Sequence, residues 1–263
     1  MNDRIAPFLV TALVAVLWTL CKEPTTILHG HVDREFGKVR DLFSDMIQRD
    51  DEGASLAVLY QGKLVLHLYG GYANRRKGIA WNKDTMAVAY SSTKIWAGLT
   101  AAILAGRGLL NYTEKVSTFW PEYSKNGKES TTVRDILDHR AGLITFGRDF
   151  TLDEAKDPDG VSTLIETATP HWVPGTSRGY HALTYGFLVD QMIRRLHPRH
   201  YTVSQFYQKE VWREGIAFSI GSGNLNQSLI ALVSNPSILQ SVAAHAKRPL
   251  TYVEFGMLLV NHG

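Results

Sequence analysis

The chain has little cysteine and no long run of like charge. Cys21 is its single cysteine, which excludes an intrachain disulfide and a zinc site built from several thiolates. The ten histidines include no H-E-x-x-H pair, so we predict no metal site and no cofactor. The net charge is only +3, and basic residues occur in short clusters such as Arg75-Arg76-Lys77. Nucleic acid is therefore not an expected partner.

One stretch near the N-terminus lacks charge altogether. Residues 5–20 read IAPFLVTALVAVLWTL, between Arg4 and Lys22. This stretch is short for a transmembrane helix and has the length of a signal h-region or signal anchor. No small-x-small cleavage site follows it, which favours an uncleaved anchor. We predict a signal anchor or signal peptide over residues 1–22 and a membrane-anchored or secreted protein. A buried N-terminal helix is the alternative.

The rest of the chain, residues 23–263, has the composition of a globular domain, since the whole sequence is 44% hydrophobic and 20% charged. Apolar residues at helical spacing predict a helix over residues 32–50. Two β-rich runs follow at residues 54–60 and 63–69, separated by Gln61-Gly62, and this pattern predicts an antiparallel hairpin. The fold is therefore expected to open with a helix and two strands.

The second half of the chain reads mainly as helices. We predict a buried helix over residues 95–110, in which Ile95, Trp96, Leu99 and Ile103 hold the helix in the core. Thr131 or Thr132 is expected to cap a short helix through Asp138. Residues 149–178 are rich in turn formers, and a further helix is expected from His181 to about Leu196. The predicted fold class is α+β.

The stretch YSSTK, residues 90–94, raises the question of chemistry. Residues three apart on a helix lie on one face, so Ser91 and Lys94 are expected side by side at a helix start. A serine hydroxyl is a weak nucleophile unless a nearby group takes its proton, and a desolvated lysine is one such group. An S-x-x-K also arises by chance in a chain of this length, and serine is an ordinary helix N-cap. The motif alone leaves both interpretations open.

Further stretches accompany this motif in a fixed order. They are ASLAVLYQGKLVLHLYGGYA, WNKDTMAVAYSSTK, ILAGRGLLNYTEKVSTFWPEY, TTVRDILDHRAGL and VPGTSRGYHALTYGFLVDQMI. Together they resemble the serine β-lactamase and penicillin-binding-protein superfamily, in the branch of class C β-lactamases, related esterases and animal β-lactamase-like proteins. The resemblance covers roughly residues 32–230. It implies a β-lactamase/transpeptidase-like fold, in which an antiparallel sheet is flanked by helices and joined to a helical subdomain.

The resemblance also implies roles for three residues. Ser91 matches the acylated nucleophile, Lys94 its proton-transfer partner, and Tyr180 the tyrosine of the second family motif. A phenol near an ammonium loses its proton more readily, so Tyr180 and Lys94 are expected to share the proton transfers. The second motif is Tyr-x-Asn or a variant in this branch, whereas here Ala182 replaces the asparagine. This change favours an esterase or peptidase-like activity over β-lactam hydrolysis. His139 matches a family histidine and is expected to stabilise a turn.

A rival motif points to another hydrolase fold. Residues 175–179 read G-T-S-R-G, which fits the G-x-S-x-G nucleophile elbow of α/β-hydrolases around Ser177. That elbow requires a buried strand directly before the serine. The preceding residues read ATPHWVP and contain two prolines, so we do not expect a strand there.

The third family motif, Lys-Thr-Gly or His-x-Gly, has no convincing match after Tyr180. We therefore expect a partial domain that lacks the C-terminal strands of the sheet. In the family that motif supplies one oxyanion-hole donor, and loss of one donor costs about 10²–10³ in rate. The open sheet edge would also invite pairing with another chain, so an oligomer is an open alternative.

Two functions follow from these expectations. The first is a serine hydrolase that acts through an acyl-serine on a small-molecule or peptide-like ester or amide. The second is a catalytically impaired scaffold with a binding or assembly role. A filament-forming member like the animal mitochondrial relatives is a third hypothesis, although the arginine-poor N-terminus argues against import into the matrix.

Overall fold

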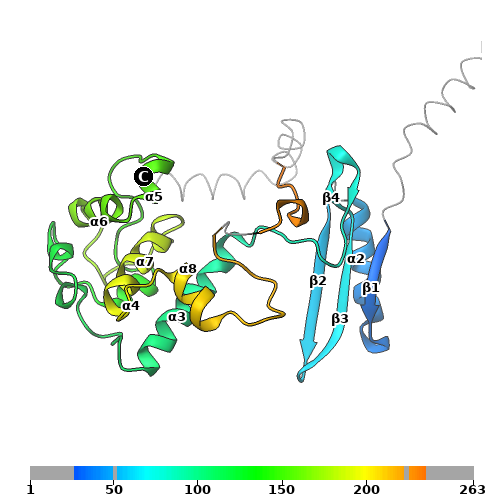
Figure 1. Ribbon diagram of the computed structural model, residues 1–263, viewed down its shortest axis with the longest axis horizontal. Helices are drawn as coiled ribbons and strands as arrows, with labels where there is room; N and C mark the ends of the chain where they lie inside the picture. Colours follow the sequence, from blue (N-terminus) through cyan, green and yellow to red (C-terminus); the bar gives the residue numbers. More distant parts are fainter. Residues whose placement is uncertain (1–26, 50–51, 222–224, 235–263) are drawn as a thin grey trace, which may run out of the picture. The chain divides into compact units, whose positions relative to one another are not determined.

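The computed structural model describes residues 27–49, 52–221 and 225–234 (Figure 1). The chain divides into two compact units. Of the described residues, the sheet unit comprises those up to Val88 and those from Asn226 onward, and the helical unit comprises those between Ala89 and Leu225. In the described ranges no helix is long and apolar enough to cross a membrane. The stretch predicted to be a signal anchor, residues 5–20, lies outside those ranges, as does Cys21.

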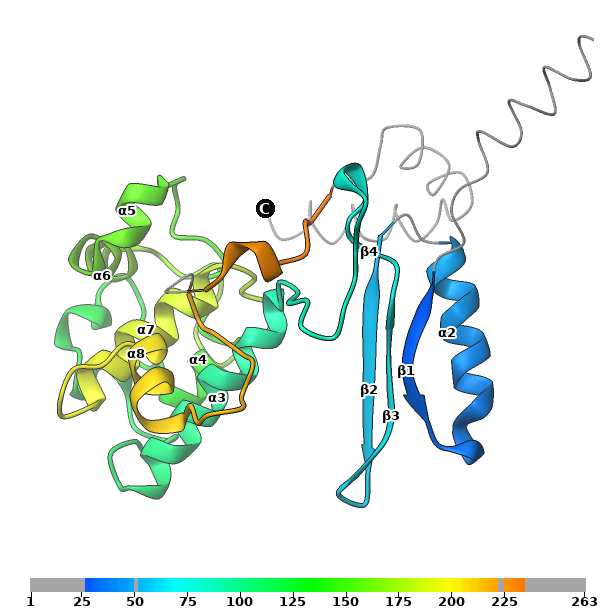
Figure 2. The ribbon, with the colours of Figure 1, turned by 45° about the vertical axis from the view of Figure 1, so that its right-hand side comes forward.

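The sheet unit contains a three-stranded antiparallel sheet. Its strands are β1 (Leu28–Val32), β2 (Ala54–Tyr60) and β3 (Lys63–Gly70), in the order β1-β3-β2. A short 3-10 helix, η1 (Arg34–Phe36), leads into helix α2 (Gly37–Arg49), which lies along the sheet (Figure 2). Buried side chains from α2 and β3 form the core of this unit, namely Phe43, Ile47, Val65, Leu66 and Leu68.

The hairpin predicted from the sequence is confirmed. Strands β2 and β3 are joined by Gln61 and Gly62, whose φ angles are +51° and +78°. Two consecutive residues with positive φ form the turn whose twist matches that of antiparallel strands, and glycine adopts this conformation without steric cost. The turn sets Tyr60 opposite Lys63, and a one-residue register shift between Val58 and Leu59 then brings Leu56 opposite Leu68.

The expectation that the fold opens with a helix is wrong. β1 precedes α2 and pairs with β3, with His31 opposite His67. Val32, assigned to the predicted helix, is the last residue of this strand. Gly30 has a φ of +109°, and a Cβ on it would lie 1.9 Å from the carbonyl oxygen of His67. The sequence LHGHV carries a glycine instead of a clear apolar alternation, which is why the strand is not visible as a pattern.

The remaining elements of the sheet unit are short. β4 (Tyr72–Asn74) pairs with β5 (Ile79–Ala80), and the 3-10 turn η2 (Arg75–Lys77) connects them. The 3-10 turn η7 (Gln227–Leu229) follows the helical unit in sequence. Backbone hydrogen bonds join Met86 to Leu229 and Ala231, and the Leu232 amide donates to the Ala73 carbonyl. Residues far apart in the sequence thus share this unit.

The helical unit is built around α7 (Thr184–Leu196). Helices α3 (Lys94–Gly106), α4 (Val133–Leu137), α6 (Pro158–Thr167) and α8 (Val203–Phe206) all contact it (Figure 1). The other elements are the 3-10 turns η3 (Tyr90–Thr93), η4 (Val116–Thr118) and η5 (Pro121–Ser124), helix α5 (Leu152–Lys156) and the π-helical turn η6 (Tyr207–Val211). A continuous core includes Leu104, Trp120, Ile136, Leu188 and Phe206, none of which is exposed to solvent.

Helix α3 begins and ends close to the predicted limits, but its buried face differs from the expected one. Ala97, Thr100, Ala101 and Leu104 are buried. In contrast, Ile95 is 71% exposed and Leu99 is 40% exposed. The helix is apolar nearly all round, so its sequence does not distinguish the face that packs on α7 and α8 from the opposite one.

The cap of α4 is confirmed, whereas α6 was missed. Thr132 accepts a hydrogen bond from the Asp135 amide, and the Asp135 carboxylate accepts one from the Thr132 amide, which forms a capping box. Residues 149–178, expected to be irregular, contain α5 and α6. Asp157 caps α6 and Pro158 occupies its first turn. Proline is favoured there, so the Asp-Pro pair begins a helix instead of breaking one.

Candidate active site

Ser91 and Lys94 lie where η3 runs directly into α3. Ser91 is in the 3-10 turn, in which side chains three residues apart lie almost above one another. Lys94 is the first residue of α3, and its Nζ donates a hydrogen bond of 3.1 Å to Ser91 Oγ. Ser91 thus does not act as a side-chain cap of the helix. The preceding Tyr90 has a φ of +43°, a strained backbone conformation of the kind that clusters at functional sites.

Tyr180 reaches the same hydroxyl from the segment between α6 and α7. Its phenol donates a hydrogen bond of 2.6 Å to Ser91 Oγ. Lys94 Nζ also lies 4.9 Å from the centre of the Tyr180 ring. The three residues singled out in the sequence therefore meet at one oxygen atom, although Tyr180 is 89 positions from Ser91 in the chain.

Lys94 is held by a backbone group as well. Its Nζ donates to the carbonyl oxygen of Ala182 at 3.0 Å, and it lies 5.7 Å from the centre of the Tyr185 ring. Ala182 occupies the position at which the resemblance implies an asparagine. The lysine is thus oriented without a side-chain amide, by a main-chain acceptor that the sequence does not reveal.

The electrostatics of this group favour ionisation of the phenol. The hydrogen bond to Ser91, and then the neighbouring Lys94, lower the pKa of Tyr180 below its ordinary value. A positive charge beside a phenol stabilises the phenolate, so less free energy is needed to remove its proton. Tyr180 is 57% exposed, and Ser91 is also exposed. The Tyr180 phenol and the Ser91 hydroxyl are therefore accessible to a substrate.

Two histidines flank Tyr180. The ring of His139 lies 4.9 Å from the Tyr180 ring, and its Nδ1 accepts a hydrogen bond from the His181 amide. His181 is fully buried. Its Nδ1 donates to the Gly179 carbonyl and its Nε2 accepts from the Leu143 amide. Burial is the main reason that the pKa of His181 falls to about 4. No sequence pattern singles out His181, because it occupies the variable position of the tyrosine motif.

The rival serine does not have the setting of a nucleophile elbow. Ser177 is exposed and lies in an irregular stretch after a turn at residues 174–176. In the described part of the helical unit no strand precedes it. Within the described ranges, no cluster of three or more histidine, cysteine, aspartate or glutamate side chains is placed to hold a metal ion.

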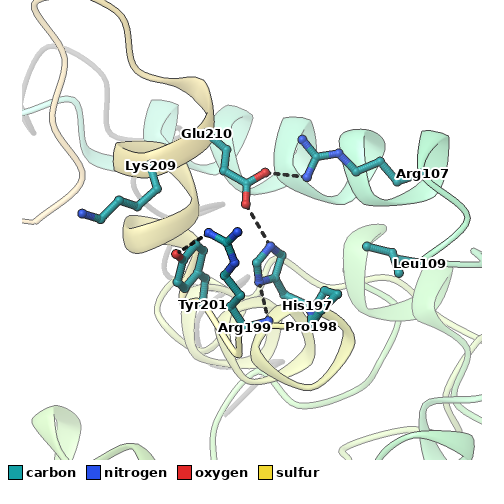
Figure 3. Close-up of a pocket in the computed structure, with 8 residues that line it drawn as sticks. All are labelled: Arg107, Leu109, His197, Pro198, Arg199, Tyr201, Lys209 and Glu210. Atoms are coloured by element: carbon teal, nitrogen blue, oxygen red, sulfur yellow. Dashed lines mark hydrogen bonds and ion pairs between the residues drawn. The ribbon is translucent and has the colours of Figure 1, made fainter.

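A cavity of about 520 Å³ occupies another part of the helical unit, and none of the three candidate residues lines it (Figure 3). Glu210 reaches Arg107 with one carboxylate oxygen, at 2.5 Å, and His197 with the other, at 3.0 Å. His197 Nδ1 accepts a hydrogen bond from the Arg199 amide. The ring hydrogen is therefore on Nε2, which donates to Glu210. These bonds tie the end of α3 to η6 and to the segment after α7. The side chains therefore brace the unit.

Several known proteins are similar to this chain in sequence and in fold. Residues 39–219 match the Beta-lactamase family. Esterase/beta-lactamase LipL from Mycobacterium tuberculosis is 35% identical over 169 residues, which cover 63% of this chain and 38% of LipL. A penicillin-binding protein homologue from Caulobacter crescentus superposes with a TM-score of 0.69 at 28% identity, over 80% of this chain and 57% of that one. A family VIII carboxylesterase superposes with a TM-score of 0.65 at 31% identity, over 70% and 50%.

The match concerns part of each relative. The chain spans less than two thirds of the length of LipL and of both solved structures. The α+β fold with an antiparallel sheet nevertheless agrees with the solved structures. The chain belongs to the Beta-lactamase family, in the branch that class C β-lactamases share with esterases.

Proposed function

We propose that this protein is a serine hydrolase that forms an acyl-serine at Ser91 from an ester, amide or peptide-like substrate. The observation that carries the proposal is the convergence of Lys94 Nζ and the Tyr180 phenol on Ser91 Oγ, at 3.1 and 2.6 Å. These distances are within hydrogen-bond reach of a nucleophile, which is the requirement for proton transfer.

The proposed reaction has two stages. Ser91 Oγ attacks the carbonyl carbon of the substrate while its proton passes to the Tyr180 oxygen. The adjacent Lys94 stabilises the negative charge that the phenolate carries before this transfer. The C–O or C–N bond to the leaving group then breaks, and the leaving group takes the proton from Tyr180. In the second stage water attacks the acyl-serine while its proton passes to the Tyr180 oxygen, the acid is released, and Ser91 Oγ takes that proton back from Tyr180.

We favour esters or simple amides over β-lactams as substrates. Ala182 contributes no side-chain amide to the site, and its carbonyl oxygen is occupied by Lys94. The side chain with which family β-lactamases recognise their substrate is therefore replaced by a methyl group. The similarity to proteins described as an esterase/β-lactamase and a carboxylesterase supports the same preference.

The experiment is a comparison of two serine variants. The full chain is treated with a fluorophosphonate probe and assayed for hydrolysis of a p-nitrophenyl ester. We expect Ser91→Ala to abolish both signals and Ser177→Ala to leave both unchanged. Ser177 is the matched control because it is an exposed serine of the same unit. Labelling that survives Ser91→Ala would show that another residue is the nucleophile.

A scaffold with a binding or assembly role is the second candidate function. It is favoured by the sheet unit, in which β2 forms one edge of the sheet and Leu59 on this strand is 68% exposed. In the described residues no strand follows β5, so the oxyanion donor that the family takes from its third motif has no counterpart there. Stoichiometric probe labelling of the monomer would exclude this function, whereas large unlabelled oligomers in light scattering would support it.

We also propose that residues 5–20 target the protein to the secretory pathway, as an anchor or a signal peptide. The support is the uncharged apolar stretch itself. Carbonate extraction of membranes from expressing cells tests this proposal. Protein in the membrane pellet or in the medium agrees with it, and protein in the cytosolic fraction contradicts it.

A further inference from the structure

His139 occupies a backbone conformation that needs a reason. It follows α4, its amide donates to the Ile136 carbonyl, and its φ is +60°. This left-handed region is uncommon for residues other than glycine, although histidine and asparagine enter it more often than most. A glycine would end the helix at lower cost. The histidine is therefore expected to supply something that a glycine lacks.

The contacts of His139 show what it supplies. Its carbonyl oxygen accepts a hydrogen bond of 3.1 Å from the Gly179 amide, directly before Tyr180. Its Nδ1 accepts a second hydrogen bond of 3.1 Å from the His181 amide, directly after Tyr180. One residue thus binds the backbone on both sides of the tyrosine. Its ring also lies 4.9 Å from the Tyr180 ring and 4.7 Å from the Tyr185 ring.

The neighbouring residues strengthen this hold. The carbonyl oxygen of Arg140 accepts hydrogen bonds from the Gly175 amide and from the Trp172 indole N–H. His181 is fixed by the Gly179 carbonyl and the Leu143 amide. The turn after α4 is therefore hydrogen-bonded at several points to the segment that carries Tyr180. Only the Nδ1 bond depends on a side chain of residue 139.

We propose that His139 is the positioning residue of Tyr180 and that its Nδ1, by accepting the His181 amide, sets the phenol against Ser91. This inference rests on the proposed function only for its consequence in catalysis. Tyr180 is exposed and its ring is not packed in the core, so its direction depends on the backbone on either side of it. A shift of about 1 Å in a reacting group can cost about 10²-fold in rate.

The bond requires an unprotonated Nδ1 on His139. Burial, Lys94 and Arg178 lower the pKa of His139, and Asp138 acts weakly in the opposite direction. The aromatic neighbours that face this ring are Tyr180, Tyr185 and His181. The acceptor is therefore available at neutral pH.

The variants His139→Asn and His139→Gly separate the hydrogen bond from the other effects. Both residues tolerate positive φ, and both remove the imidazole ring. Asparagine retains an acceptor, its Oδ1, close to the place of Nδ1, and glycine does not. Any difference between the two variants therefore reports on the bond to the His181 amide.

The first readout is the rate at which a fluorophosphonate labels Ser91 at increasing probe concentration. We expect His139→Gly to lower the maximal labelling rate about 10- to 100-fold at an unchanged half-saturating concentration, and His139→Asn to stay within about threefold of the wild type. Equal rates for the two variants would overturn the proposal.

The second readout does not depend on activity. The Tyr180 phenol is titrated by NMR in protein with ¹³C-labelled tyrosine, and Tyr180→Phe identifies its signal. Contact with Ser91 and Lys94 lowers the pKa of Tyr180, so we expect the low value in His139→Asn and a return toward 10 in His139→Gly. The same value in both variants would overturn the positioning role. A wild-type protein that does not label, but shows this difference, would contradict the proposed function alone.

Discussion

The two units of this protein differ in the size of their buried cores in the described residues. In the helical unit Trp120, Ile136 and Leu188 have no exposed surface. In the sheet unit Leu66 and Leu68 are buried beside α2, but Leu59 and Leu64 on the same hairpin are 68% and 46% exposed. Ser91, Lys94 and Tyr180 all belong to the helical unit. The candidate site therefore belongs to the unit that has the larger buried core in the described residues.

This difference indicates that the proposed reaction at Ser91 depends mainly on the helical unit. A site needs side chains whose positions are fixed by packing and hydrogen bonds. The helical unit supplies both, through α3, the turn after α4 and the start of α7. Changes to the buried or hydrogen-bonded side chains of this unit should affect the site or the stability strongly, whereas changes at exposed positions of the hairpin should affect neither.

The largest effect is expected from Lys94→Met, which removes the amine from the site and keeps an unbranched side chain. Loss of a group that assists proton transfer lowers rates by about 10²–10⁴-fold, so fluorophosphonate labelling of Ser91 should slow by this factor. Lys156→Met is the control, since Lys156 is exposed in the same unit and pairs with the exposed Asp153. Labelling of Lys94→Met at the wild-type rate would remove Lys94 from the mechanism.

The next largest effect is expected on the free energy of unfolding, in a comparison of two leucines of α3. Leu104 is fully buried and Leu99 is 40% exposed. Replacement of a buried leucine by alanine costs about 2–5 kcal/mol in the free energy of unfolding, because apolar contacts are lost and a cavity remains. Leu99→Ala should cost less than about 1 kcal/mol, as expected for a partly exposed position. Urea unfolding measures both, and equal losses would mean that the two faces of α3 are not different.

Acid should weaken the helical unit through His181. The unfolded chain binds a proton at His181 near pH 6.5, whereas the pKa in the folded protein is about 4. Between these values the unfolded state holds more protons, so the free energy of unfolding falls as the pH drops from 6.5 to 4. The expected loss is on the order of 2 kcal/mol.

The variant His181→Gln tests the origin of this loss. Glutamine retains an acceptor for the Leu143 amide and does not titrate in this range. Urea unfolding at pH 7 and pH 5 should show a smaller loss in the variant than in the wild type. An equal loss in both proteins would assign the effect to other groups.

The smallest effect on the free energy of unfolding is expected from a substitution on β2. Leu59→Lys should change the free energy of unfolding by less than about 0.5 kcal/mol, because the side chain is exposed. A lysine on a sheet edge also opposes edge-to-edge pairing, so light scattering should show less association. Leu66→Lys is the matched comparison, since Leu66 is 1% exposed and its replacement should prevent folding of the sheet unit. A large loss from Leu59→Lys would show that this face is covered.

The sequence predicted those features that local chemistry determines. The hairpin at Gln61-Gly62 and the cap at Thr132 follow from residues next to one another in the chain. Ser91 and Lys94 were found for the same reason, since three-residue spacing brings them together. Tyr180 was found through the resemblance, because no local rule links it to a serine 89 positions away.

The features that were missed depend on distant contacts or on main-chain groups. β1 is a strand because β3 lies beside it, and the segment LHGHV has no pattern of its own. The exposed face of α3 is set by the position of α7, not by the apolar sequence of the helix. Lys94 is held by the Ala182 carbonyl, and the rings of His139 and His181 accept hydrogen bonds from main-chain amides. Almost every residue carries such main-chain groups, so a sequence cannot single out these ones.

The central claim is that Ser91 is the nucleophile, and peptide mapping of the fluorophosphonate adduct tests it most directly. The full chain is labelled, digested and analysed by mass spectrometry. The account predicts one adduct per chain, on the peptide that contains Ser91, and its absence from the Ser91→Ala variant. An adduct on Ser177 or another residue, or an unmodified chain after prolonged exposure, would contradict it.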